Sequence, residues 1–263
     1  MLDRLRARGS KWRELVSEKM RLARMELIAG ECETPPTDLN RLAKRLGIVK
    51  VREVDLGMRG RLLQEKQGLV VEINTELEPF EKRRVFAHEL GHLLVERRAI
   101  KQSALFDKGR FGYGSSYATV EKLCDKVAQE ILIPLAWLRN RLANSRQCLH
   151  VVEAVAEETQ CSPYYVATRI VEESLWGSCF LLWYVAGKKP QLKAAIPPSA
   201  GDPFEAGLAN PEYALTMLRS LAEHRLIRGD LFISFEEGVI TKKVEYSPSG
   251  PQSVLMMIHE HAR

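Results

Sequence analysis

The chain has 263 residues, of which 45% are apolar and 28% charged, and this composition is that of a globular protein rather than a disordered or fibrous one. No apolar run reaches the roughly 18–20 residues that a membrane-spanning helix needs, and the N-terminus lacks the apolar stretch of a secretory signal, so we expect a cytoplasmic protein that does not bind membranes. Five cysteines, none of them at the Cys-x-x-Cys spacing, argue against zinc ribbons and thioredoxin-like chemistry and indicate free thiols in a reducing compartment.

The net charge of +5 is concentrated at the N-terminus, because residues 1–30 hold eight basic and four acidic side chains. Apolar residues recur at helical spacing over 10–28, which predicts an amphipathic helix whose charges form its solvated face. The sequence predicts a linker over 31–37, followed by a short helix capped by Asp38 and stopped by Gly47.

Short strands are predicted around 49–51 and 62–63, with a further strand at 69–73 that pairs through a turn at 66–68. Pro79 favours the start of a helix that extends to about residue 96. Residues 101–117 hold three glycines and two tyrosines and predict a functional or disordered loop. A helix over about 119–133 follows, and Pro134 ends it.

Residues 135–175 continue as helices, with a break at 160–163 where Ser162 caps the next helix. Beyond Gly177 we predict a hairpin of 179–185 with 192–196, a Pro-rich loop at 197–211 and a helix capped by Asn210. Three more strands are predicted at 231–235, 239–246 and 254–258. The fold class is therefore α+β, with a second α+β domain from about residue 176.

The most specific motif is His88-Glu89-Leu90-Gly91-His92, an H-E-x-x-H inside the helix predicted to begin at Pro79. Two imidazoles at positions i and i+4 project from one helical face and can converge on one ion. Glu89 points to the side, where it can act as a general base without being a ligand. The alternative interpretation is a pair of exposed helix histidines.

A catalytic zinc site needs a third protein ligand. The extended metalloprotease pattern would place Gly at 95 and His at 98, but this chain has Val95 and Arg98. The third ligand is therefore expected to be a carboxylate from a later helix. Glu121 is the best candidate because it lies on an apolar stripe of its helix, where an unpaired carboxylate is costly. The alternative interpretation is that the Glu121 carboxylate lies in the first helical turn and only interacts favourably with the helix dipole. Asp125, one turn on, is a candidate partner for the second nitrogen of a ligand histidine.

The run 85–94 around this motif, followed by 121–134, resembles the ImmA/IrrE family of metallopeptidases. Proteins of this family carry an H-E-l-G-H helix and then a segment E-x-x-A-N/D-x-F-A-x-x-L-L-M-P. The present chain departs from that segment by apolar replacements, namely Cys124 for Ala, Val127 for Phe and Ile133 for Met.

The resemblance implies a zincin-like domain over 1–140 with a small antiparallel sheet and a helical, helix-turn-helix-like segment over 141–175. It implies a C-terminal sensor or interaction domain, resembling a GAF domain, over 176–263. In this scheme His88, His92 and Glu121 hold Zn²⁺, or Mn²⁺ or another divalent ion, and Glu89 is the base. Tyr113 or Tyr117 is a candidate donor to the oxyanion, against the alternative of ordinary loop packing.

Members of the family resemble one another in cleaving XRE-type helix-turn-helix repressors, which switches on stress-response or mobile-element genes. The resemblance therefore implies a zinc-dependent endopeptidase with such a repressor as its protein substrate. Residues 150–175 carry five glutamates and one arginine, so we expect no direct binding of nucleic acid. Two alternatives stay open: a sensor or binding protein with a structural or idle metal site, and a metallohydrolase that acts on a non-peptide substrate.

Overall fold

A computed structural model places two compact units in the chain, Met1–Leu138 and Arg139–Arg263. The sequence-based division at residues 140 and 175 stays a prediction. The structure describes residues 32–96, 115–186, 189–196, 227–235, 238–249 and 253–259. The predicted helix 10–28, the Pro-rich loop 197–211 and the helix that follows Asn210 lie outside these ranges.

Helix α2 (Leu39–Arg45) begins and ends where the sequence predicts it. The backbone N–H of Arg41 donates to Oδ1 of Asp38 at 3.0 Å, which is the expected N-cap bond. Gly47 follows the helix with φ of +87°, a left-handed conformation that glycine adopts without strain. The predicted cap and stop residues are therefore confirmed.

Strands β1 (Ile48–Val54), β2 (Gly60–Glu65) and β3 (Gly68–Asn74) form a sheet in the order β1-β3-β2. The antiparallel hairpin of β2 and β3 confirms the predicted turn. β1 pairs with β3 in parallel, so the sheet is mixed and the prediction of a purely antiparallel sheet is wrong. Alternation of apolar residues defines the two faces of a strand but carries no information about its direction.

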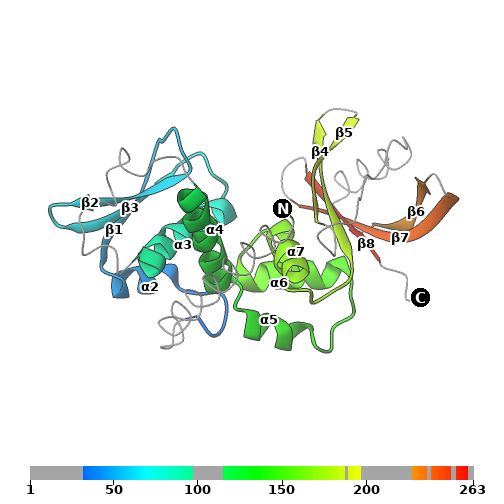
Figure 1. Ribbon diagram of the computed structural model, residues 1–263, viewed down its shortest axis with the longest axis horizontal. Helices are drawn as coiled ribbons and strands as arrows, with labels where there is room; N and C mark the ends of the chain where they lie inside the picture. The colour runs from blue at the N-terminus through cyan, green and yellow to red at the C-terminus, as the bar shows by residue number, and fades with distance from the viewer. Residues whose placement is uncertain are drawn as a thin grey trace, which may run out of the picture. The chain divides into compact units, whose positions relative to one another are not determined.

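Helices α3 (Pro79–Glu96) and α4 (Ser115–Leu132) lie side by side, and α3 packs on β2 and β3 (Figure 1). The limits of α3 are those predicted. α4 begins four residues before the predicted start at Thr119, because Gly114 is the last helix-breaking residue before it. Residues 115–117 are therefore helical rather than part of the predicted loop 101–117, and the rest of that loop lies outside the described residues.

Thr37 connects the segment before α2 to both of these helices. Its hydroxyl donates to the carbonyl oxygen of Ile131 in α4 at 2.6 Å, and its own carbonyl accepts from the guanidinium of Arg83 in α3 at 2.7 Å. Thr37 is buried, so these hydrogen bonds are shielded from water and help to fix the relative positions of the two helices.

Three further helices follow: α5 (Leu135–Leu142), α6 (Leu149–Thr159) and α7 (Pro163–Glu172). The breaks at Pro134 and at 160–162 were predicted, whereas the break at 143–148 was not. Pro134 separates α4 from α5, and the boundary between the two units falls inside α5. The hydroxyl of Ser162 caps α7 by accepting from the N–H of Tyr165 at 3.2 Å. Sequence reasoning therefore located both ends of the α6–α7 turn.

A five-stranded antiparallel sheet, in the order β5-β4-β8-β7-β6, forms the rest of the second unit. Its strands are β4 (Cys179–Ala186), β5 (Lys189–Ile196), β6 (Ile227–Phe235), β7 (Gly238–Pro248) and β8 (Ser253–Ile258). All five were predicted. Helix α7 packs on β4 and α6 packs on β7, so the two helices and the sheet share one core.

A buried carboxylate joins α6 to this sheet. Oε2 of Glu245, on β7, accepts from the backbone N–H of Leu149 at 2.7 Å, and the residue is only 3% exposed. Cys148 at the N-cap position makes no side-chain cap bond, so Glu245 supplies the missing acceptor from another element. Arg228 donates to its other oxygen at 3.1 Å, and His259 lies 3.5 Å from that oxygen.

The fold is α+β, with six helices and two small sheets in the described ranges. Among these helices, none combines the length and the apolar character that crossing a membrane requires. All five cysteines are free thiols.

Candidate metal centre

Helix α3 presents both histidines of the H-E-x-x-H motif toward α4. His88 and His92 are one turn apart, and their ring centroids are 4.9 Å apart in an edge-to-face arrangement. Each side chain keeps 20% of its surface exposed. The two imidazoles are therefore neither fully buried in the core nor free on the surface, which leaves them accessible to an ion.

Glu121 on α4 faces both imidazoles. Nε2 of His88 lies 3.2 Å from its Oε2, and Nε2 of His92 lies 3.6 Å from its Oε1. The candidate ligand atoms of the three residues all lie within 4.8 Å of one another. Glu121 keeps 31% of its side chain exposed, so the cluster is open on one side.

These distances fit one small cation. Two ligand atoms that lie 2.0–2.1 Å from a tetrahedral zinc ion are about 3.3 Å apart. The two nitrogen–oxygen distances, each to a different oxygen of Glu121, are close to that value. Two neutral imidazoles and one carboxylate are also the donor set of many hydrolytic zinc sites, which leave the fourth position open. His88, His92 and Glu121 can therefore hold a divalent metal ion.

Asp125 contacts the other nitrogen of His88, with 2.9 Å between Oδ1 and Nδ1. Burial lowers the pKa of His88, but the hydrogen bonds to Asp125 and Glu121 raise it by more than burial lowers it. The pKa therefore lies at about 9, above the usual 6.5. The pKa of Asp125 is raised by its own partial burial and lowered more strongly by the bond to His88, so it lies below its usual value. Asp125 thus stays ionised and fixes the ring with Nε2 toward Glu121.

Glu89 lies beside the cluster without belonging to it. The residue is 7% exposed, and burial raises the pKa of its carboxyl although the neighbouring His92 and His88 lower it. The backbone N–H of Leu62 in β2 also donates to this carboxylate. A carboxylate with a raised pKa, held next to a candidate metal position, has the property that a general base needs near neutral pH.

Two glycines permit the close approach of these elements. A Cβ atom on Gly91 would lie 2.9 Å from the carbonyl oxygen and 3.2 Å from Cα of Cys124, so α3 and α4 can pack this closely only with glycine at this position. A Cβ atom on Gly60 would collide with Val85 and lie 3.6 Å from Oε1 of Glu89. Both glycines therefore bring neighbouring backbone close to the site.

Five of the predicted site residues lie together: His88, Glu89, His92, Glu121 and Asp125. Their roles stay predictions. Tyr113 lies outside the described residues. Tyr117 lies in the first turns of α4 rather than in a loop, and its side chain also lies outside the description.

Sequence reasoning missed three features of this region: the bond from Leu62 to Glu89, the close approach at Gly91, and a contact of 3.4 Å between Sγ of Cys124 and Nδ1 of His92. Only the glycine had a signal, since glycine inside a helical pattern usually has a packing reason. Glu130, also on α4, is buried and accepts from the N–H of Leu135 at 3.4 Å.

Comparison with known proteins agrees with this geometry. Residues 43–171 match the model of the family described as the IrrE N-terminal-like domain, peptidase family M78. No curated protein matches the chain. A Mycobacterium tuberculosis transcriptional regulator of known structure is similar in fold, with a TM-score of 0.59 and 12% identity over 94% of this chain and 76% of that one. The matched segment contains α3 and α4 with the whole His-His-Glu cluster, and this match confirms the resemblance of residues 43–171 to the ImmA/IrrE family of metallopeptidases.

Proposed function

We propose that the protein is a metal-dependent endopeptidase whose active centre is formed by His88, Glu89, His92 and Glu121. The observation that carries the proposal is the convergence of three ligand atoms within 4.8 Å beside a buried carboxylate with a raised pKa. The family assignment supports a peptidase rather than a hydrolase of another substrate class. We further propose Zn²⁺ as the ion, although the same donors accept Mn²⁺ and other divalent ions.

Each residue has a distinct part in the proposed reaction. The two histidines and Glu121 would hold a divalent ion, which would supply the Lewis acidity needed to activate water and to polarise a peptide carbonyl. Glu89 accepts the proton of the attacking water at its carboxylate and then delivers it to the nitrogen of the leaving amine. The N–H of Leu62 keeps the Glu89 carboxylate oriented during both transfers. Asp125 holds His88 in the orientation that directs Nε2 inward.

The proposed substrate is a helix-turn-helix repressor of the XRE type, whose cleavage would switch on stress-response or mobile-element genes. This part of the proposal depends on the family resemblance, and the similarity in fold to a transcriptional regulator is consistent with a role near transcription. The acidic residues of α6 and α7 support the expectation that the protein itself does not bind DNA. Glu158 of α6 pairs with Arg141, and Glu173, directly after α7, pairs with Arg169, both within the second unit.

For the second unit we propose a sensor or interaction role, resembling that of a GAF domain. Its separate antiparallel sheet, with helices on it, supports this proposal because nothing in the peptidase reaction requires such a unit. We also propose a cytoplasmic location, which the five free thiols support.

Replacing Glu89 with Gln tests the enzyme directly. The full-length protein loaded with zinc should cleave the repressor encoded beside its gene, and Glu89→Gln should lower the rate by about 10²–10⁴-fold, since the general base is lost. The variant should still bind one zinc ion per chain, because Glu89 is not among the candidate ligands. Metal content and cleavage products are both measured by mass spectrometry.

Three other outcomes would change the proposal. Full cleavage by Glu89→Gln with zinc bound would contradict the assigned base. Zinc binding without any peptidase activity would favour the sensor with an idle metal site. Cleavage of unrelated peptides but not of the repressor would support the peptidase activity and contradict the proposed substrate.

A further inference from the structure

We propose that Cys124 is a positioning residue for His92: its thiol sulfur accepts a hydrogen bond from Nδ1 and thereby directs Nε2 of the same ring toward the metal position. This inference rests on the proposed function, because it assumes that His92 is a metal ligand. It goes beyond that function by assigning a role to a side chain that sequence patterns identify only as a buried apolar position.

The geometry at His92 carries the proposal. Sγ of Cys124 lies 3.4 Å from Nδ1 of His92, which is within the range of hydrogen bonds to sulfur. Nε2 on the opposite side of the ring lies 3.6 Å from Oε1 of Glu121. Cys124 has no exposed surface, so the contact is shielded from water. The imidazole is thus held between a thiol and the carboxylate that is its candidate co-ligand.

One helix supplies the partners of both histidines. Glu121, Cys124 and Asp125 occupy positions i, i+3 and i+4 of α4 and therefore share one helical face. Asp125 contacts Nδ1 of His88 at 2.9 Å as Cys124 contacts Nδ1 of His92 at 3.4 Å. Each imidazole therefore has its Nε2 toward Glu121 and its Nδ1 toward a partner one turn further along α4.

Gly91 explains how Cys124 comes close enough. A side chain at position 91 would occupy the space taken by the Cys124 backbone, whose carbonyl oxygen would lie 2.9 Å from the added Cβ atom. Gly91 precedes His92 directly and lies one turn beyond His88. Its missing side chain lets the backbone of Cys124 approach α3 at this turn, and from there the Cys124 thiol reaches Nδ1 of His92.

The chemistry of the two partners differs in strength. An imidazole that uses Nε2 as a ligand carries its proton on Nδ1, and this N–H needs an acceptor. The carboxylate of Asp125 is a strong acceptor, whereas a thiol sulfur is a weak one. His92 is consequently held less firmly than His88, and removal of the thiol should have a measurable effect on zinc binding rather than abolish it.

Three forms of the full-length, metal-free protein test this role: the parent, Cys124→Ala and Cys124→Ser. Zinc affinity is measured by competition with a chromophoric chelator. We expect Cys124→Ala to bind zinc about 10-fold more weakly, at the lower end of the range for partners of ligand histidines. Cys124→Ser should stay closer to the parent, because its hydroxyl oxygen also accepts a hydrogen bond.

A second readout follows His92 itself. Long-range ¹H–¹⁵N correlation spectra of the zinc-loaded protein should show a proton on Nδ1 of His92 that exchanges slowly in the parent and in Cys124→Ser. The same proton should exchange faster and shift in Cys124→Ala. Val127→Ala is the control, because it truncates another buried side chain of α4. It should lower the unfolding midpoint while leaving zinc affinity and the His92 signal unchanged.

The outcomes separate this inference from the proposed function. If Cys124→Ala binds zinc as tightly as the parent and keeps the His92 signal, the positioning role is wrong and the metal centre stands. If affinity falls equally in the Ala and Ser variants, in step with a loss of stability, Cys124 acts only by packing and the inference is also wrong. If the parent binds no zinc, or His92→Ala binds it as tightly as the parent, the metal centre itself fails. Where Cys124→Ala does not fold, Cys124→Val removes the acceptor without leaving a cavity.

Discussion

Gly91 is the residue on which the spacing of α3 and α4 most directly depends. Replacement by Ala adds a Cβ atom 2.9 Å from a backbone oxygen of Cys124, and backbone cannot move aside as a flexible side chain can. Ala favours a helix by up to about 1 kcal/mol over Gly, but overpacking costs about 1–3 kcal/mol, so we expect Gly91→Ala to be destabilising. Urea unfolding measures this change, and zinc affinity should fall with it because Glu121 moves away from the histidines.

Gly57→Ala is the matched control, since a Cβ atom at that position meets nothing within 4 Å. It should change the free energy of unfolding by no more than about 0.5 kcal/mol and leave zinc affinity as it is. A Gly91→Ala protein as stable as the parent, with unchanged zinc affinity, would contradict the packing argument.

At this scale the sequence could predict the residues whose roles depend on local spacing. His88 and His92 are one helical turn apart whatever else the chain does, and Glu121 was found because a carboxylate on an apolar stripe needs a partner. The contacts of Cys124 with His92 and of Leu62 with Glu89 could not be predicted. They depend on how α4 is rotated about its axis and on which backbone groups of β2 face α3.

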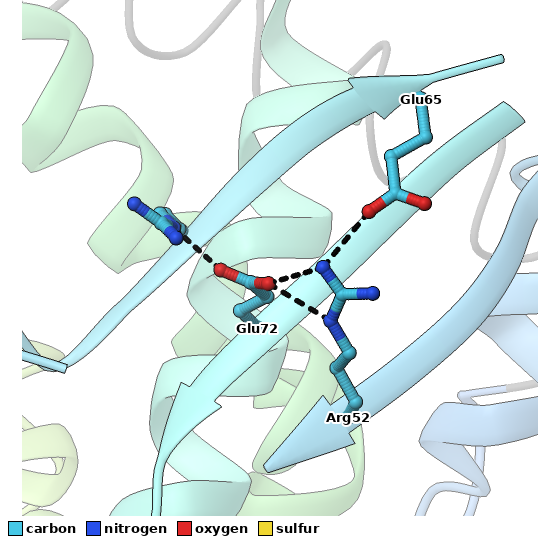
Figure 2. A network of polar contacts seen from close by, with 4 residues as sticks. Arg52, Glu65 and Glu72 are labelled. Carbon is cyan, nitrogen blue, oxygen red and sulfur yellow. Dashed lines mark hydrogen bonds and ion pairs between the residues drawn. The ribbon is translucent and has the colours of Figure 1, made fainter. Parts of the chain in front are cut away.

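A network of charged side chains centred on Glu72 of β3 stabilises the sheet β1-β3-β2. Figure 2 shows the carboxylate of Glu72 beside the guanidinium of Arg52, which also reaches Glu65. The guanidinium of Arg61 donates to the other oxygen of Glu72. Glu72 is 3% exposed, whereas Arg52 and Arg61 keep about a third or more of their side-chain surface exposed. The network therefore joins all three strands through one buried carboxylate.

This network predicts part of the acid unfolding of the protein. Burial raises the pKa of Glu72, but hydrogen bonds from Arg52 and Arg61 outweigh it, so the pKa lies below the usual value of 4.5. The stability that Glu72 contributes is then present above its unfolded pKa and is lost as the pH falls through the lower, folded pKa. His88 adds no slope below about pH 5, because it is protonated in both the folded and the unfolded chain there.

We expect Glu72→Gln to lower the free energy of unfolding at pH 7 by about 1–3 kcal/mol and to reduce its decline between pH 5 and pH 2. Urea titrations of the metal-free protein at several pH values measure both effects. Glu65→Gln removes a carboxylate that is 40% exposed and should change stability by less than about 1 kcal/mol. An acid profile of Glu72→Gln that parallels that of the parent would refute this account.

Among the elements, sequence reasoning succeeded where a cap or breaker residue marked the limit. Asp38, Pro79, Pro134 and Ser162 gave correct helix boundaries, since their backbone chemistry is local. The parallel pairing of β1 with β3 was not predictable in this way, because strand direction depends on the route of the connection between β1 and β2. The start of α4 was misplaced because Ser115 and Ser116 are as common in turns as at helix ends.

For the whole molecule, the three candidate ligands all belong to the first unit. Zinc at about 100 times its dissociation constant should stabilise the unit that binds it by about 2.7 kcal/mol. We therefore expect zinc to slow hydrogen exchange of α3 and α4 amides by up to about 100-fold and to leave that of β4, β7 and β8 unchanged. Exchange followed by mass spectrometry, with His92→Ala as the control that should lose the effect, measures this difference.

Equal protection of both units by zinc would contradict the assignment of the binding energy to the first one. Protection of neither, with zinc bound elsewhere, would contradict the metal centre. The division into domains at residues 140 and 175 stays a prediction. In the structure α6 and α7 pack with the strands that follow them.

The bond from Glu245 to the first turn of α6 has a practical consequence for anyone who shortens the gene. The family match stops at residue 171, which makes that position a tempting end for an expression fragment. Such a fragment would keep α6 and α7 but lose the strand that caps one of them and the sheet that covers their apolar sides. The exposed surfaces would promote aggregation, so failure of a truncated sample to stay in solution would say nothing about the catalytic competence of the intact chain.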